Sequence, residues 1–311
     1  MPNVLSVQSH VVHGFVGNKS ATFPLQLLGF NVDPLNSVHF SNHTGYSVFT
    51  GDRLEGDRLR ELVRGLEHNG LLSEYSHFVG GYLGRVGVLE EVVSLVQKLP
   101  VSTLKLIDPV LGDNNHLYVP NELVPIYRDC LIPLADVITP NGFEAELLSG
   151  VSIKSTKDVF SALKRLHALG PTSVVITSVD LDEAFPTLTL FCSHSPSKQV
   201  YSIEFPKLKG SFTGTGDLFA ALLLARLGSD TLGLKIDVDH LVSACELAVS
   251  TLHHVLNETV DWMKLKGVYN EGSSGERGDD NVKFRELRLI ESKKWIESPT
   301  VLFKATLLKD E

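Results

Sequence analysis

The sequence predicts an α/β protein whose central, mainly parallel sheet is covered by helices on both faces. Short apolar runs rich in β-branched residues alternate with segments of helical spacing, from residue 4 to residue 177. Two extended runs then follow each other directly, at 187–192 and 199–205, which indicates an antiparallel addition at one edge of the sheet.

The earlier extended runs share an apolar composition and lie at residues 4–7, 31–38, 77–79, 104–107, 136–139 and 174–177. The helical segments have apolar residues three or four positions apart and lie at 20–28, 58–66, 86–99, 143–148, 157–169, 216–225 and 238–259. Asn18 precedes the first helix and is expected to cap it. Residues 269–283 are polar and glycine-rich, which predicts a flexible surface loop, and residues 284–308 regain hydrophobic alternation and are expected to pack back.

Length and composition favour a single domain over residues 1–311. The 311 residues are 43% hydrophobic and 21% charged, and single cores usually stop growing near ~250–300 residues. A net charge of −9 disfavours nucleic acid as a partner. The apolar run 218–225 is far shorter than the ~20 residues that span a bilayer, so no membrane partner is expected. Three scattered cysteines without a CxxC pair fit a reduced, cytoplasmic location, each as a buried apolar residue.

The strongest local motif is Gly214-Thr215-Gly216-Asp217, placed directly before a helical run. Glycines at a helix start allow several N–H groups to point the same way, and the helix dipole adds positive potential, so the motif predicts an anion site. Asp217 could take a proton from a hydroxyl that attacks a phosphoryl group. It could equally be an ordinary aspartate of a first helical turn.

Acidic and polar groups also follow two predicted strands. Asp108 and Asp113 suit Mg²⁺ or a magnesium-bound phosphate, although Asp-Pro and Gly-Asp are also common turn dipeptides. Asn141 and Glu144 fit a capping box at a helix start. Because these groups all follow strands, we expect them at the one sheet edge where open α/β proteins bind ligands.

Other motifs are absent or ambiguous. Residues 14–20 end like a phosphate-binding loop, but Asn18 stands where that motif requires glycine, and Phe219 replaces the third glycine of a dinucleotide fingerprint. The pairs at 10/13 and 253/254 are histidines of a polar loop or helix surface rather than metal ligands. The polar segments 6–10 and 41–46 suit a flat, polar-edged small molecule, or simply form turns.

Taken in order along nearly the whole chain, these blocks resemble pyridoxal kinases of the eukaryotic type. The most specific are VLSVQSH (4–10), NSVHFSNHTGY (36–46), DPVLGD (108–113), TPNGFEAE (139–146) and FTGTGDLF (212–219). The GTGD motif alone would indicate only the wider ribokinase-like superfamily. The resemblance implies a three-layer α/β/α sandwich that acts as a cytoplasmic homodimer. It implies ATP-dependent phosphorylation of the 5′-hydroxymethyl group of pyridoxal, pyridoxine and pyridoxamine, a vitamin B6 salvage reaction that gives pyridoxal 5′-phosphate.

The resemblance also assigns residues. Asp217 would be the catalytic base, and the N–H groups from Gly214 to Gly216 would hold the transferring phosphoryl group. Substrate would contact Ser9, Val16, Phe40, Thr44, Tyr82 and Asp217. ATP would contact Asp108, Tyr118, Asn141, Glu144, Thr177, Ser178, Leu208 and Thr215. Asp113 and Glu144 would position Mg²⁺ or another divalent ion, and Asp108, Thr139 and Thr177 would hold K⁺ or Na⁺.

The sequence departs from the family pattern in three places. Gly80 replaces a hydroxyl residue, Gly142 replaces a glutamine, and the flap at 113–118 is short. Two other functions stay open. One is a hydroxymethylpyrimidine or sugar kinase of the same superfamily, and the other is a catalytically silent vitamin-binding protein.

Overall fold

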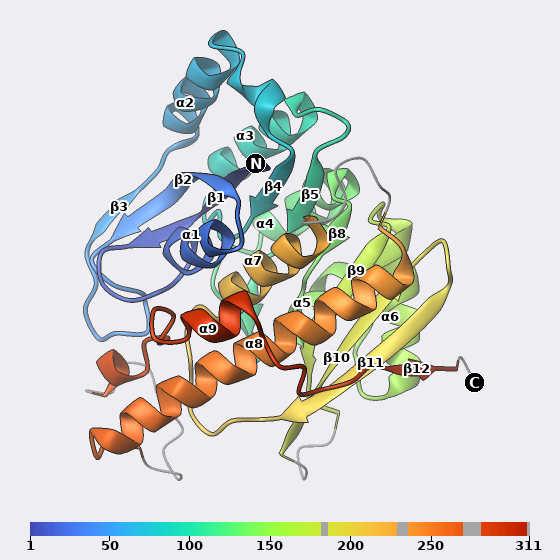
Figure 1. Cartoon of the computed structure of the whole chain (residues 1–311). Helices are drawn as coiled ribbons and strands as arrows, with labels where there is room; N and C mark the ends of the chain where they lie inside the picture. Colours follow the sequence, from blue (N-terminus) through green and yellow to red (C-terminus); the bar gives the residue numbers. More distant parts are fainter. Residues whose placement is uncertain (182–185, 229–235, 270–280, 310–311) are drawn as a thin grey trace.

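The computed structural model describes residues 1–181, 186–228, 236–269 and 281–309, and its centre is a ten-stranded sheet (Figure 1). The strand order is β12-β11-β10-β9-β8-β5-β4-β1-β2-β3. The six strands from β9 to β2 in this order pair in parallel, whereas β10, β11 and β12 at one edge and β3 at the other are antiparallel. The predicted antiparallel addition at one edge is therefore confirmed.

The strands of this sheet are β1 (Asn3–Val11), β2 (Asn31–Phe40), β3 (Gly51–Arg53), β4 (His77–Gly80), β5 (Leu104–Ile107), β8 (Val137–Ile138), β9 (Ser173–Val179), β10 (Thr187–His194), β11 (Gln199–Pro206) and β12 (Thr306–Leu308). A separate hairpin joins β6 (Gly112–Asp113) to β7 (His116–Leu117).

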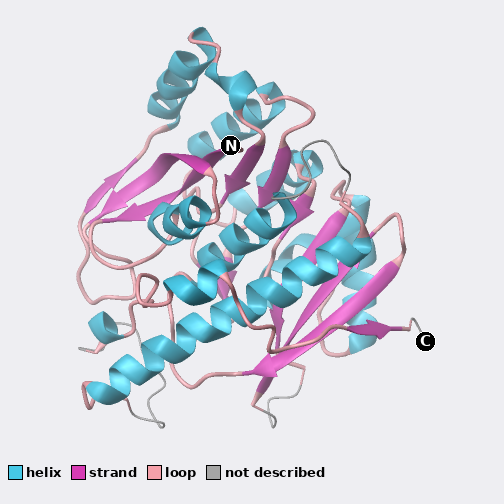
Figure 2. Ribbon diagram, viewed as in Figure 1, coloured by secondary structure: helices cyan, strands magenta, loops and turns pink. Residues whose placement is uncertain are grey.

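Helices cover both faces of the sheet, as the ribbon view shows (Figure 2). One layer contains α2 (Gly56–His68), α3 (Val86–Lys98), α4 (Leu123–Ile126), α5 (Gly142–Ser149) and α6 (Thr156–Ala168). The other contains α1 (Asn18–Leu27), α7 (Thr215–Gly228), α8 (Val238–Leu265) and α9 (Lys293–Glu297). The predicted fold class, a sandwich with a mainly parallel sheet, is confirmed.

Each face of the sheet has its own apolar core. Phe78 and Ile107 point into the core under α3, whereas Val79 and Leu106 point into the core under α7. Successive side chains of a strand alternate between faces, so a parallel strand buried on both sides reads as a continuous apolar run. That is why the short runs in the sequence predicted these strands correctly.

The C-terminal segment packs back onto the second helical layer, as its hydrophobic alternation predicted. Leu287, Leu289 and Ile296 are fully buried against that layer, and β12 pairs with β11. Most of the predicted loop 269–283 lies outside the described residues.

Two local predictions are wrong. Asn18 does not cap α1, because Gly17 is the residue before the helix and the Asn18 side chain is used elsewhere. Its Nδ2 donates to the Leu35 carbonyl at 3.0 Å, and its Oδ1 accepts from Ser6 Oγ at 2.7 Å, which joins α1 to β1 and β2. Cys130 is exposed, unlike Cys192 and Cys245, because its short π-helical turn presents it to solvent.

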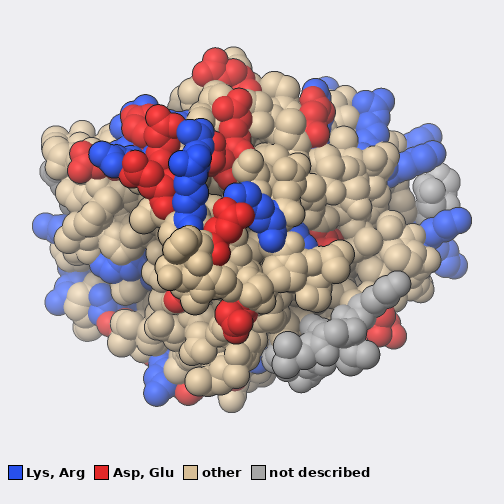
Figure 3. Space-filling view, turned by 90° about the horizontal axis from the view of Figure 1, so that it is seen from above, with Lys and Arg blue, Asp and Glu red and all other residues tan. Residues whose placement is uncertain are grey.

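The charged side chains of the described residues are interspersed rather than segregated in the view of Figure 3. Ion pairs such as Lys98–Glu67 at 2.6 Å, and Arg60 with Glu91, join α2 to α3. Within the described ranges, no helix has both the length and the apolar character needed to cross a membrane.

Candidate active site

The parallel strands carry the predicted site residues at their carboxyl ends, at one edge of the sheet. Ser9 lies in the last part of β1, Asp108 directly follows β5, Thr139 directly follows β8, and Thr177 lies in the last part of β9. This placement confirms the geometric expectation that groups following parallel strands meet at a single edge.

Asp217 lies in the first turn of α7, facing the loop that follows β1. Its Oδ2 accepts a hydrogen bond from the Gly17 N–H at 2.7 Å. Burial raises the pKa of Asp217, and the Gly17 N–H opposes that shift. A carboxylate with a raised pKa is a stronger base, so the position suits proton abstraction.

The loop before α7 reaches this place because Gly214 has φ 88°, a conformation that favours glycine. A Cβ on Gly214 would also clash with the Phe15 carbonyl oxygen. The first N–H groups of α7 have no partner within the helix and are available to an anion. The anion site predicted from the GTGD motif thus lies against the 12–17 loop.

Asp108 is 5% exposed and lies beside the same helix start. A Cβ on Gly216 would be 3.5 Å from Asp108 Oδ2, and Thr139 Oγ1 donates to Asp108 Oδ1 at 3.1 Å. Burial and the charge of Asp217 raise the pKa of Asp108. The structure therefore brings Asp108, Thr139 and Asp217 together.

Glu144 and Asn141 form the predicted capping box at the start of α5. Glu144 also reaches outside its helix: Oε1 accepts from the Leu111 N–H at 2.8 Å and from the Gly112 N–H at 3.3 Å. Asn141 Nδ2 donates to the Gly112 carbonyl at 2.7 Å. Burial and Asp108 nevertheless raise the pKa of Glu144 well above its usual value. This helix start is thus joined to the loop that follows β5.

The short flap is the β6–β7 hairpin. Asn114 and Asn115 have φ values of 50° and 60°, as a two-residue hairpin turn with two left-handed positions requires. The Asp113 carboxylate accepts from the Asn114 N–H at 2.8 Å and is exposed, whereas Glu144 is buried. Tyr118 follows the hairpin and is 54% exposed.

The apolar residues predicted to line the substrate pocket form one small cluster. Val16 and Phe40 are buried together with Val11 and Val38, and Tyr82 packs against them. Ser9 lies next to Gly17, where a Cβ would clash with the Ser9 Oγ. Thr44 is exposed, in a loop whose Gly45 is close to Thr213. The cluster therefore adjoins the start of α7.

Several of the residues predicted for ATP lie around the start of α5. The Thr177 N–H donates to the Pro140 carbonyl at 2.9 Å. A Cβ on Gly142 would lie 3.1 Å from the Ser178 carbonyl oxygen, so the glycine permits a close approach of β9 to α5. Thr215 begins α7, and Leu208 lies shortly after the end of β11.

One carboxylate of this region was missed by sequence reasoning. Glu286, 9% exposed, accepts from the Phe15 N–H and contacts His43 and Tyr46. It lies 271 positions from Phe15, so no local spacing links them. The only local signal was a glutamate within the hydrophobic alternation of the C-terminal segment.

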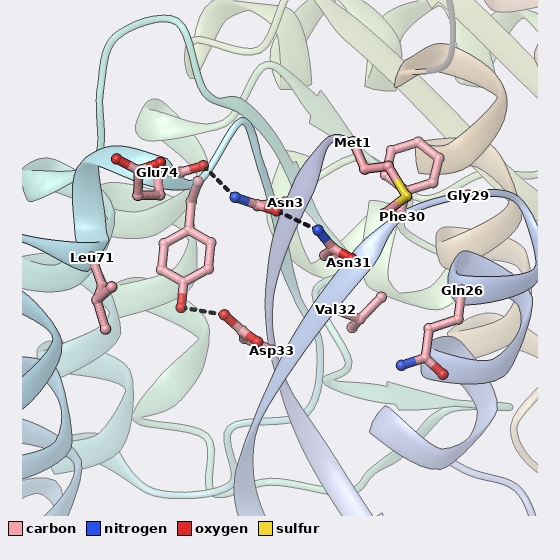
Figure 4. Close-up of a pocket in the computed structure, with 11 residues that line it drawn as sticks. Met1, Asn3, Gln26, Gly29, Phe30, Asn31, Val32, Asp33, Leu71 and Glu74 are labelled. Carbon is pink, nitrogen blue, oxygen red and sulfur yellow. Dashed lines mark hydrogen bonds between the residues drawn. The ribbon is translucent and has the colours of Figure 1, made fainter.

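A cavity of about 640 Å³ lies at the amino ends of the parallel strands, opposite the carboxyl ends that carry the predicted site residues. Figure 4 shows Asn3 and Asn31 at the amino ends of β1 and β2 within it. None of the predicted site residues lines this cavity. Among the described residues no group of three or more His, Cys, Asp or Glu side chains could hold a metal ion unaided.

A glycine-bearing helix start beside buried carboxylates, at the carboxyl ends of parallel strands, is the arrangement of a small-molecule kinase. The family model described as phosphomethylpyrimidine kinase matches residues 76–257. That match begins after the segment that carries Ser9, Val16, Phe40 and Thr44, so it describes the class of kinase and leaves the substrate pocket undefined.

The similarity to full-length relatives also covers the part of the chain before residue 76. Pyridoxal kinase of Ovis aries is 43% identical, with 98% of each chain covered, and that of Arabidopsis thaliana is 46% identical, covering 97% of this chain and 93% of the other. A solved structure of pyridoxal kinase from Leishmania donovani, in complex with ADP and pyridoxamine, superposes with a TM-score of 0.85 at 35% identity, covering 99% and 100%. The chain belongs to the pyridoxal kinase family, which confirms the resemblance of its sequence blocks.

Proposed function

We propose that this chain transfers the terminal phosphoryl group of ATP to the 5′-hydroxymethyl group of pyridoxal, pyridoxine and pyridoxamine, in vitamin B6 salvage. The observation that carries the proposal is the hydrogen bond between Gly17 and Asp217. It joins the substrate-pocket loop to the phosphoryl-binding helix start. In this proposal the contact holds the base next to the acceptor alcohol of a bound substrate.

In the proposed reaction Asp217 takes the proton of the hydroxymethyl group as the hydroxymethyl oxygen attacks the terminal phosphorus of ATP, and the bond from that phosphorus to the leaving ADP breaks. The N–H groups from Gly214 to Gly216 stabilise the charge that develops on the phosphoryl oxygens. Val16, Phe40 and Tyr82 pack against the pyridine ring, while Ser9 and Thr44 hydrogen-bond its polar edge. Tyr118 and the β6–β7 hairpin cover ATP and exclude water.

The acidic groups of the site fit bound cations. Burial and neighbouring carboxylates raise the pKa values of Asp108 and Glu144, and in the described residues no Lys or Arg contributes to these shifts. We propose Asp113 and Glu144 for Mg²⁺, and Asp108, Thr139 and Thr177 for K⁺ or Na⁺. Mg²⁺ would neutralise charge on the transferring phosphate, and it commonly uses only one or two carboxylates together with phosphate oxygens.

The remaining contacts proposed for ATP follow the same edge. Asn141, Thr177, Ser178, Leu208 and Thr215 would bind the nucleotide between α5 and α7. Cytoplasmic location and a homodimer complete the proposal, both by analogy with the family. Size-exclusion chromatography with light scattering would test the dimer, with a monomeric mass as the contrary result.

The alternative substrate is a hydroxymethylpyrimidine, favoured by one observation, the family model that matches residues 76–257. A coupled assay of ATP consumption with pyridoxal, pyridoxine, pyridoxamine and hydroxymethylpyrimidine decides between the two. We expect turnover of the pyridoxal group with Mg²⁺, and stimulation by K⁺. Faster turnover of the pyrimidine would overturn the proposal, and binding without turnover would indicate a silent vitamin-binding protein.

A further inference from the structure

One buried carboxylate, that of Glu286, joins two loops that are far apart in the sequence. Its Oε2 accepts from the Phe15 N–H at 3.0 Å. Its Oε1 accepts from the Tyr46 hydroxyl at 2.9 Å and lies 3.3 Å from His43 Nε2. The 12–17 loop and the 41–50 loop are therefore held by the two oxygens of a single side chain.

Which group donates in the contact between His43 Nε2 and Glu286 follows from the hydrogen bond at His43 Nδ1. The Gly45 N–H donates to His43 Nδ1 at 3.1 Å, so Nδ1 is the acceptor and Nε2 carries the hydrogen. His43 Nε2 then donates to Glu286 without needing a second proton. Burial opposes the charge of Glu286, but the hydrogen bonds from His43, Tyr46 and Phe15 outweigh it and lower the pKa of this carboxyl.

The chain is shaped to receive this carboxylate. Gly14 has φ 89°, and a Cβ there would clash with both carboxylate oxygens of Glu286. On the other side, Leu287 is fully buried, and the Arg288 N–H donates to Thr259 Oγ1 of α8 at 3.1 Å. The Arg288 guanidinium lies over the Trp262 ring at 4.4 Å. Glu286 is thus a fixed group that projects from the helical layer toward the two loops.

These loops carry the groups that the proposed function needs. The 12–17 loop contains Val16 and Gly17, whose N–H binds Asp217. The 41–50 loop contains Thr44, directly after His43. We propose that Glu286 is a positioning residue for the vitamer: it holds both loops at the pyridine ring while taking no part in the phosphoryl transfer itself. This inference rests on the proposed function.

The test is Glu286→Gln, which keeps the size of the side chain. A glutamine offers one acceptor oxygen, and its NH₂ group would face either the Phe15 N–H or the Tyr46 and His43 donors. We expect KM for pyridoxal to rise about 10- to 100-fold, with KM for ATP unchanged and kcat reduced less than KM is raised. Binding of pyridoxal, measured by fluorescence without ATP, should weaken by the same factor.

Glu291→Gln is the matched control, since Glu291 is an exposed glutamate of the same segment whose ion pair is with Arg288. It should leave both KM values unchanged. Tyr46→Phe removes one donor only, and we expect a smaller rise in KM for pyridoxal that adds little in the Glu286→Gln background. This variant decides the matter if Glu286→Gln does not fold.

The outcomes separate the two proposals. A wild-type protein that does not phosphorylate pyridoxal would refute the proposed function itself. If the wild-type protein phosphorylates pyridoxal and Glu286→Gln leaves KM for pyridoxal unchanged, only the positioning role is refuted. If Glu286→Gln does not fold, an unchanged KM in Tyr46→Phe refutes the positioning role in the same way. An equal rise in both KM values would mean a general structural role and would also refute it.

Discussion

Both the amino ends and the carboxyl ends of the parallel strands carry polar and acidic side chains, but the two sets differ in how these side chains are paired. At the amino edge two pairs of polar groups are matched: Asn31 Nδ2 donates to Asn3 Oδ1 at 3.0 Å, and the Tyr75 hydroxyl donates to Asp33 at 2.8 Å (Figure 4). At the carboxyl edge, burial and the charge of Asp217 raise the pKa of Asp108, and burial raises the pKa of Asp217. If stability were the only requirement, we would expect the acidic groups at both ends of the strands to have hydrogen-bond donors or cationic side chains as partners. Unmatched acids at one edge therefore mark the place where cations and phosphate are expected.

The largest expected effect is that of Asp217→Asn at the carboxyl edge. The asparagine Oδ1 still accepts from the Gly17 N–H, but it cannot take a proton, so kcat should fall by about 10³-fold or more. Stability should stay the same or rise, because one buried charge beside Asp108 is removed. Steady-state kinetics and thermal unfolding measure the two.

The same substitution at the amino edge, Asp33→Asn, is the control, since Asp33 lies away from the site. It should leave kcat and KM unchanged. A wild-type kcat in Asp217→Asn would remove the assignment of the base, and a large kinetic loss in Asp33→Asn would remove the distinction between the edges.

Glu144→Gln is next in expected size. Both carboxylate oxygens accept N–H groups, Leu111 at one and Asn141 at the other, and the amide can accept at only one. We expect a loss of about 1–3 kcal/mol in the free energy of unfolding, from one unpaired N–H, and a fall in kcat/KM of about 10- to 100-fold.

Asp158→Asn supplies the comparison for Glu144→Gln. Asp158 also accepts hydrogen bonds at a helix start, from Ser155 Oγ at 2.8 Å, but on the surface of α6. Asp158→Asn should lower the free energy of unfolding less than Glu144→Gln does, because the Asp158 carboxylate is accessible to water, and it should have no kinetic effect. If the two variants had equal kcat/KM, Glu144 would have only a capping role.

At the amino edge, we expect His77 to make the free energy of unfolding depend on pH. It is 3% exposed, and burial lowers its pKa to about 4 from the ordinary 6.5. The unfolded chain therefore binds a proton that the folded chain does not, so stability falls as pH falls from about 6.5 to about 4. His77→Gln should reduce that loss by about 3 kcal/mol, measured by urea unfolding across this range.

Parallel profiles for the His77→Gln and wild-type proteins would show that His77 has an ordinary affinity for protons in the folded chain.

The sheet and the acids at the carboxyl ends of its strands could be predicted from the sequence because both depend on local patterns. The apolar run before Asp108 and the capping pair at Asn141 and Glu144 are each visible within eight residues. Asn18 was misassigned because its side chain bonds to Leu35 rather than to its own helix. Glu286 was missed because its partner lies 271 positions away, and such a contact exists only after the chain folds.

The smallest effects come from one substitution made at both edges. Tyr75→Phe removes the hydroxyl that donates to exposed Asp33, and Tyr127→Phe removes the one that donates to the Gly81 carbonyl at 3.1 Å, next to Tyr82. Each should cost about 0.5–1.5 kcal/mol in the free energy of unfolding. Only Tyr127→Phe should raise KM for pyridoxal, by about two- to fivefold, because only its partner backbone leads into the pocket. Equal KM values for pyridoxal in the two variants would mean that the loop after β4 keeps its position without the Tyr127 hydroxyl. Tyr127 would then not contribute to substrate binding, although it lies near the acids of the carboxyl edge.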